Sequence, residues 1–254
     1  MFLPRVKTLI CWLPIALLLM GGENTCTVSR LPLTERDQGF VDPSIMGIWS
    51  ENAAVDHIDL DSKPEEAGYE PDFELGFDDS GNLKIVEYGK EGAVDAVYTG
   101  FTSVISGRRY LNVSLTACAS CDEEELAKIY AGTCPFQIWQ YSKELPPALL
   151  QPQTSEDFQL TADRIEEIRI AISEGPYLLI AYMSNEFVGD AINDGLIEGD
   201  PDCDECSSAA TWRAGACITA EQTAIQKFVT KYDAQLYPAD NWGIFMKVPS
   251  GRPE

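Results

Sequence analysis

Alternating apolar and polar residues run through the middle of the chain and predict antiparallel strands. The segments 72–77 and 83–88 alternate on either side of Asp78-Asp79-Ser80-Gly81-Asn82, and this run of turn residues predicts a β-hairpin. Segment 93–105 alternates more weakly and continues through the turn Ser106-Gly107 into a strand over 108–115. Further strands are predicted over 136–141, 177–183 and 242–248.

Apolar residues at helical spacing appear in the second half of the chain. Ser184 is expected to cap a short helix that Gly195 ends. The segment 218–236 predicts the longest helix, with Thr219 and Gln222 as a capping box. One face of this helix is apolar and predicts core packing: Ile225, Phe228, Val229, Tyr232 and Leu236.

The segment 165–173 fits two periodicities. Ile165, Ile168 and Ile172 lie at helical spacing, whereas Ile168, Ile170 and Ile172 alternate as in a strand. Because the turn residues 174–176 lead directly into the strand 177–183, we favour a hairpin for the second half of this segment.

These elements predict a β-rich α+β fold. We expect an antiparallel meander or a partly open barrel with two or three helices, one of them near the C-terminus. A helix packed against the sheet would protect strand edges that otherwise invite aggregation. The predicted organisation is a tether over 26–43 and a single domain over 44–254 with disulfide-stapled helical insertions.

The first 25 residues have the features of an export signal. Arg5 and Lys7 precede the apolar run 8–20, and Gly21-Gly22 follows it. The apolar run is too short to span a bilayer comfortably. We therefore expect export to the periplasm or to a membrane-anchored position in the cell envelope.

Cys26 is a candidate for lipidation, because it follows the apolar run by a few residues. Its position is similar to that of the modified first residue of bacterial lipoproteins, which implies a membrane anchor at Cys26. The preceding residues Glu23-Asn24-Thr25 depart from the small-residue pattern of that family. Cleavage after the glycines and an uncleaved anchor remain as alternatives.

The composition excludes several partners. The 254 residues carry 18 basic and 41 acidic side chains, for a net charge of −23, and 45% of the residues are hydrophobic. Such a chain can bury a substantial core, but it repels a phosphate backbone, so we expect no nucleic-acid partner. The same charge disfavours direct binding to anionic lipid.

Six cysteines beyond Cys11 and Cys26 fall into two clusters. The first contains Cys118, Cys121 and Cys134, and the second contains Cys203, Cys206 and Cys217. In an oxidising compartment an even number of cysteines indicates disulfides. Three cysteines per cluster cannot all pair internally, so complete pairing requires a bridge between clusters across about 85 residues.

The paired cysteines could also serve in redox chemistry or in zinc binding. A strand, Cys118-Ala-Ser-Cys121 and a helix follow one another as in thiol oxidoreductases, but the acidic run 122–125 disfavours a thiolate. Four of the six thiols could instead bind zinc. Structural disulfides are the favoured interpretation.

Other candidate chemistry is weak. His57 is the only histidine and lies between two aspartates, which is typical of a solvated side chain. The segment 200–205 resembles half a calcium loop but has Glu205 in place of the required glycine. Asn112-Val113-Ser114 is a glycosylation sequon inside a predicted strand. No catalytic set or cofactor motif is present, so we expect no enzyme and no cofactor.

The opening Gly47-Ile48-Trp49 resembles the Gly-x-Trp motif of lipocalin-like barrels. Together with Tyr110-Leu111-Asn112-Val113 and the helix end 191–195, it also resembles uncharacterised proteobacterial envelope lipoproteins. That resemblance implies a location rather than a chemistry.

We therefore expect a non-enzymatic exported envelope protein that binds a small apolar ligand or an envelope protein. The alternative is a thiol-disulfide or metal-handling protein that uses its Cys-x-x-Cys motifs.

Overall fold

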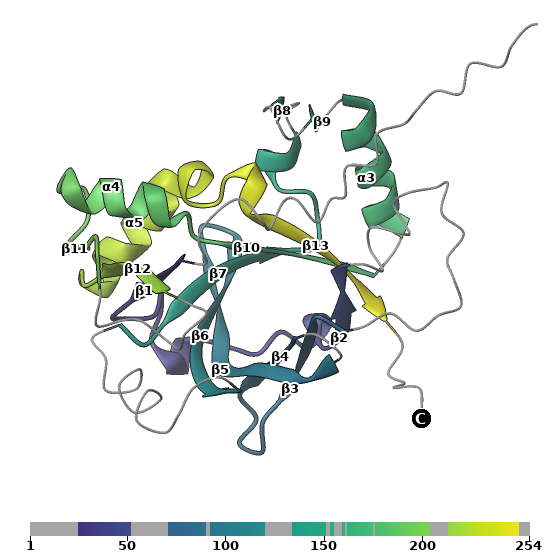
Figure 1. Ribbon diagram of the computed structural model, residues 1–254, viewed down its shortest axis with the longest axis horizontal. Helices are drawn as coiled ribbons and strands as arrows, with labels where there is room; N and C mark the ends of the chain where they lie inside the picture. Colours follow the sequence, from purple (N-terminus) through teal and green to yellow (C-terminus); the bar gives the residue numbers. More distant parts are fainter. Residues whose placement is uncertain are drawn as a thin grey trace, which may run out of the picture.

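Eight antiparallel strands form a closed barrel in the computed structural model (Figure 1). The structure describes residues 25–51, 71–89, 92–119, 134–150, 153–154, 159–160, 162–174, 176–203 and 213–248. Around the barrel, the strands follow one another in chain order: β2 (Gly47–Ser50), β3 (Phe73–Phe77), β4 (Leu83–Tyr88), β5 (Val94–Ile105), β6 (Arg108–Cys118), β7 (Gln137–Ser142), β10 (Tyr177–Tyr182) and β13 (Trp242–Val248).

The barrel strands form an antiparallel meander, as expected, but the meander closes on itself, which corrects the expectation of a partly open barrel. The last strand, β13, pairs on one side with β10 and on the other with β2, where Lys247 lies opposite Trp49. Closure removes both free sheet edges. A closed eight-stranded antiparallel barrel is the architecture that lipocalins have.

The predicted hairpins are confirmed. Asp78 accepts hydrogen bonds from the backbone N–H groups of Ser80 and Asn82, at 2.8 Å each, and Gly81 takes a φ of 79°. Ser106 and Gly107 both have positive φ, at 52° and 81°, so they form the two-residue turn between β5 and β6.

Alternate residues of each strand fill the barrel. The buried interior set includes side chains from all eight strands, among them Trp49, Leu75, Ile85, Val113 and Ile180. The outer faces of β6, β7, β10 and β13 contribute to a second buried cluster with the helices. In Figure 1 the helices accordingly lie outside the ring, along the side formed by β7, β10 and β13.

The helix α3 (Ala162–Glu174) corrects the preference for a hairpin in this segment. Ile165, Ile168 and Ile172 are buried, whereas Ile170 is 45% exposed. The helical spacing therefore decided the structure, because only a helix places those three isoleucines on one side. Within the described residues, no helix is long and apolar enough to cross a bilayer.

Two further α-helices lie within the described residues, α4 (Asn185–Asn193) and α5 (Gln222–Leu236). Ser184 caps α4 by accepting a hydrogen bond from the Phe187 N–H, as predicted. The capping box predicted for α5 does not form, because the helix begins later and Gln222 donates instead to the Pro32 carbonyl. The residues before it form the strand β12 (Arg213–Ile218), which the sequence did not indicate.

Residues 26–43 pack on the domain, although we expected a tether. The strand β1 (Thr25–Ser29) pairs in parallel with β12, and β12 also pairs with β11 (Gly199–Asp200). The chain then follows the barrel through the 3₁₀ helices Arg36–Gln38 and Pro43–Ile45. Val28 and Leu33 are buried, which explains why this mostly polar segment packs on the domain.

Three smaller elements complete the fold. The strands β8 (Gln153–Thr154) and β9 (Gln159–Leu160) pair with each other. The 3₁₀ helices Pro147–Leu150 and Ala239–Asn241 lie before β8 and before β13.

Candidate functional site

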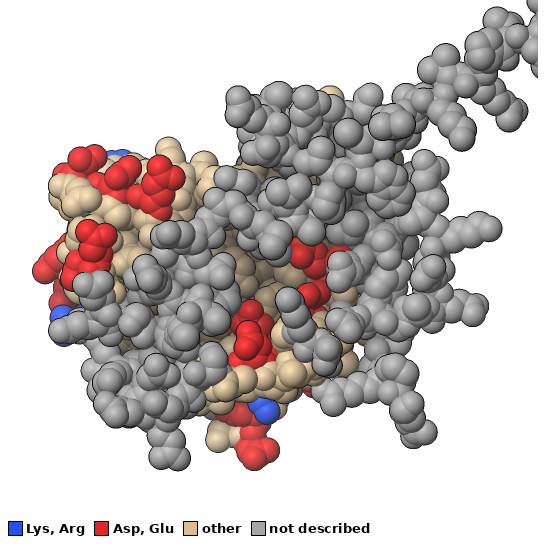
Figure 2. Space-filling view, in the orientation of Figure 1, with Lys and Arg blue, Asp and Glu red and all other residues tan. Residues whose placement is uncertain are grey.

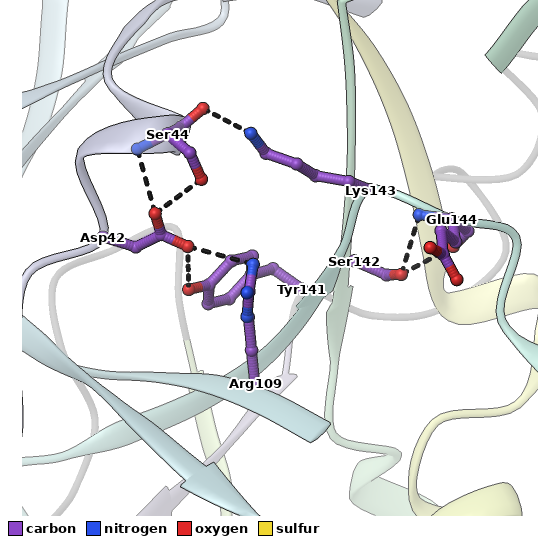
Figure 3. Close-up of polar contacts among 7 residues, drawn as sticks. All are labelled: Asp42, Ser44, Arg109, Tyr141, Ser142, Lys143 and Glu144. Carbon is purple, nitrogen blue, oxygen red and sulfur yellow. Dashed lines mark hydrogen bonds and ion pairs between the residues drawn. The ribbon is translucent and has the colours of Figure 1, made fainter. Parts of the chain in front are cut away.

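One end of the barrel is filled by the chain itself, and we call it the plugged end. It is defined by residues 42–46, which immediately precede β2. Asp42 lies at its centre and accepts hydrogen bonds from the Tyr141 hydroxyl at 3.0 Å and the Ser44 backbone N–H at 2.9 Å (Figure 3). Its other contacts are an ion pair with Arg109 and a hydrogen bond from the Ser44 hydroxyl.

These contacts set the protonation state of Asp42. Burial alone would raise the pKa of this carboxyl. The hydrogen bonds from Ser44 and Tyr141, together with the charge of Arg109, outweigh burial and hold the pKa of Asp42 below its usual range. Asp42 is therefore a structural anion that fixes the plug to β6 and β7.

Cations hold the rest of the plug. Lys143 donates to the Ser44 carbonyl and Lys247 donates to the Met46 carbonyl, each at 2.7 Å. The Lys247 ammonium also lies 5.9 Å from the centre of the Trp49 ring, and the Trp49 indole N–H donates to the Ile45 carbonyl. The Gly-x-Trp opening thus connects the plug to the first barrel strand.

The opposite end carries four acidic side chains, and we call it the carboxylate end. Glu51 follows β2, Asp72 precedes β3, Glu87 ends the inner face of β4, and Asp95 begins β5. Because neighbouring strands are antiparallel, these four positions meet at one end of the barrel. Figure 2 shows acidic side chains near the middle of the face toward the viewer, and further ones at the upper left over α4.

Glu87 points into the barrel. It lies opposite Phe73 of β3 and Ala96 of β5, both of which belong to the buried interior. The Tyr98 hydroxyl donates to Glu87 at 3.0 Å. Burial, with the charges of Asp95 and Asp72, raises the pKa of Glu87 to about 7 despite that hydrogen bond.

Glu51 is bound to the same group through its backbone. Its N–H donates to an Asp72 carboxylate oxygen at 2.6 Å. Burial of the Glu51 side chain, followed by the charge of Asp72, raises its pKa to about 7 as well. Two carboxyls at this end therefore exchange protons near neutral pH.

Aromatic rings lie in the interior next to these carboxylates. Trp139 is central: its ring is 5.2 Å from that of Tyr98, 5.1 Å from that of Tyr182 and 6.5 Å from that of Phe73. Phe245 extends the set at 5.2 Å from Phe73. Tyr182 is only partly buried, so the ring cluster reaches the surface. The aromatic cluster and the carboxylates thus lie side by side at this end of the barrel.

The sequence analysis missed the carboxylate end, although one signal was present. In the predicted strand 83–88 the inward positions are Leu83, Ile85 and Glu87. An acidic residue on the apolar face of an amphipathic strand is unusual, since its burial requires a partner or a proton. Glu51 carried no such signal, because it lies outside the predicted strands. Asp72 carried none either, because it lies on the polar side of the predicted strand 72–77.

The cysteines form at least one bridge between the two clusters. Cys134 and Cys217 are disulfide-bonded, with Cα atoms 6.1 Å apart and a sequence separation of 83. The bridge joins the segment before β7 to β12. It therefore fastens the three-stranded sheet β1-β12-β11, which we call the side sheet, to the barrel. Cys118 and Cys203 are also disulfide-bonded. Cys121 and Cys206 lie outside the described residues.

The remaining candidates that the structure describes lie apart from the carboxylate end. Cys26 belongs to β1, in the side sheet. Asn112 is fully buried and accepts a hydrogen bond from the Leu33 N–H, so the sequon is not accessible in the fold. Asp200 accepts from the Asp202 N–H in a local turn. His57 and Glu205 lie outside the described residues.

The part of the chain that the structure describes contains no candidate metal site. Within it, no group of three or more histidine, cysteine, aspartate or glutamate side chains has a geometry suited to a metal ion.

Comparison with protein-family models, with curated proteins and with solved structures finds no match to this chain.

Proposed function

We propose that this chain is a non-enzymatic, exported protein of the cell envelope whose barrel binds a small ligand at the carboxylate end. The carrying observation is the contrast between the two barrel ends. Residues 42–46 fill one end through dedicated hydrogen bonds, whereas the other combines aromatic rings with carboxylates. An apolar or aromatic ligand body fits the rings, and a positively charged group fits Glu87 and Glu51.

A pair of probes of nearly equal shape tests the ligand class. 2-Phenylethylamine carries a positive charge and 2-phenylethanol does not. Because Glu87 lies beside the rings, we expect the amine to bind at least about tenfold more tightly, since a charge-assisted contact contributes more than 1 kcal/mol. Calorimetric titration of the intact, oxidised protein measures both affinities.

Two variants locate the binding. Glu87→Gln should remove the preference for the amine, and Tyr182→Leu should weaken both probes. The matched control is Glu186→Gln, because Glu186 is an exposed residue of α4. Equal binding of the two probes would reduce the proposal to an apolar ligand, and no binding of either would refute it.

Export and anchoring need a separate experiment. We expect the protein in the envelope fraction, with residues 1–25 removed. If Cys26 is lipidated, its substitution by serine should release the protein from membranes. Recovery of the full-length chain in the cytosol would contradict the proposal.

A further inference from the structure

The two ends of the barrel differ in how their carboxylates are compensated. At the plugged end, Asp42 has Arg109, Tyr141 and Ser44 as partners, and Lys143 and Lys247 bind carbonyls beside it. At the carboxylate end, the charged groups of the described residues that act on Glu87 and Glu51 are Asp72 and Asp95, which carry the same sign.

The partners of Glu87 come from the strands beside it. Tyr98 of β5 supplies one hydrogen bond to the carboxyl. Asp95 also belongs to β5, while Asp72 directly precedes β3. The residues opposite Glu87 in the ladders are Phe73 and Ala96, neither of which solvates a charge. An ionised Glu87 is therefore stabilised by one hydroxyl and repelled by two aspartates.

Glu51 is held in the same cluster by the backbone. The hydrogen bond from its N–H to Asp72 keeps the latter carboxylate at the barrel end. Ionisation of Glu51 places a second negative charge beside it. A proton removes the repulsion and also makes each carboxyl a hydrogen-bond donor.

We propose that Glu51 and Glu87 form a proton-binding site at this end of the barrel: protonation of the two carboxyls relieves the repulsion from the neighbouring aspartates and so stabilises the folded barrel. The inference concerns the barrel itself and stands whether or not a ligand binds there. On the proposed function, protons and a cationic ligand compete for the same carboxylates, so ligand affinity falls on acidification.

The direction of the pH effect follows from the raised pKa values. Both carboxyls have a pKa of about 7 in the fold, above the ordinary glutamate value of 4.5. The folded state therefore binds more protons than the unfolded chain between these values. The stabilisation is present at mildly acidic pH and is lost as the pH rises through about 7.

Urea unfolding at about pH 5 and about pH 8 measures this linkage. We expect the folded-to-unfolded ratio of the wild type to fall on the order of tenfold per carboxyl between these conditions, after allowance for partial exposure. The double variant Glu51→Gln/Glu87→Gln should lose that part of the pH dependence. The control Glu186→Gln should keep the pH dependence of the wild type. General repulsion in a chain of charge −23 affects the control and the double variant alike, so it does not account for a difference between them.

A second measurement is independent of the variants. Carbon-13 labelling of the glutamate carboxyls in the full chain reports each titration directly, and two signals are expected to titrate near pH 7. The proposal is overturned if every glutamate titrates near its ordinary pKa, or if the double variant retains the wild-type pH profile.

Discussion

At the scale of single residues, buried polar groups explain how this acidic chain fixes its strands. Asn112 is fully buried on the outer face of β6. Its side-chain oxygen accepts from the Leu33 N–H at 2.6 Å, and its amide donates to Ser103 at 2.7 Å. Asn112 thus joins the N-terminal segment to two barrel strands, and it performs this role only because its amide has both a donor and an acceptor.

Replacement of Asn112 by alanine should therefore be strongly destabilising. The Leu33 N–H would lose its acceptor in a buried site, so we expect a loss of about 2–3 kcal/mol in the free energy of unfolding. Urea unfolding at constant pH measures the loss. Asn193→Ala, at an exposed position of α4, is the control and should change stability by less than about 0.5 kcal/mol. Equal effects of the two substitutions would contradict this role.

The lowered pKa of Asp42 predicts a pH dependence of folding stability opposite to that of Glu51 and Glu87. Its pKa is lowered in the fold, so its contribution is present above the ordinary aspartate value and is lost as the pH falls through the folded value. Asp42→Asn should lower stability by about 1–2 kcal/mol near neutral pH and weaken the acid-induced loss below about pH 4. Asp37→Asn, an exposed neighbour, provides the comparison. If Asp42→Asn loses as much stability below about pH 4 as the wild type, the role of Asp42 in holding the plug is contradicted.

At the scale of elements, α3 tests which of two periodicities governs a segment. Ile172 is buried and Ile170 is exposed. Because a strand would place both on one face, the helix predicts different costs for the two: about 2–4 kcal/mol for Ile172→Ala and less than about 1 kcal/mol for Ile170→Ala. Thermal and urea unfolding give both values. Similar losses at the two positions would support the strand instead.

The elements also show what sequence reasoning reaches. Seven barrel strands and the helices α4 and α5 follow from periodicity and turn residues, because their local pattern agrees with their burial. The hairpin predicted for the second half of segment 165–173 was wrong. The turn residues 174–176 indicate a hairpin, but the helical spacing of the isoleucines determines the structure. The segment 26–43 resembles a tether because its buried apolar residues, Val28 and Leu33, are too sparse to form a periodic pattern.

Closure and the carboxylate end depend on contacts that no local pattern contains. β2 and β13 pair across nearly 200 residues, which only the whole chain decides. Glu51 belongs to a segment without periodicity and Asp72 to the polar side of a predicted strand, and their proximity follows from the barrel. Only Glu87 was marked in the sequence, by its place on an apolar strand face.

At the scale of the whole molecule, the Cys134–Cys217 disulfide connects the barrel to the side sheet. Closing a loop of 83 residues in the unfolded chain contributes about 4–5 kcal/mol in the loop-entropy description. The double variant Cys134→Ala/Cys217→Ala should lose about 2–5 kcal/mol of unfolding free energy. Unfolding without reductant is required, because Cys118 and Cys203 are also bridged.

Intact mass is the control for this variant, since it shows whether the remaining cysteines are still oxidised. A variant with correct oxidation and unchanged stability would show that the barrel and the side sheet hold together without the bridge.

The parallel pairing of β1 with β12 has a consequence for how the chain folds. Cys26 pairs with Ala214, and the barrel closes only when β13 reaches β2. A chain delivered with its N-terminus first therefore exposes its earliest strands long before their partners arrive. Such non-local pairing slows folding and leaves unpaired strand edges in the meantime. Holding the emerging chain apart from its neighbours until residue 248 is free would thus matter as much to this protein as the contacts that hold it once folded.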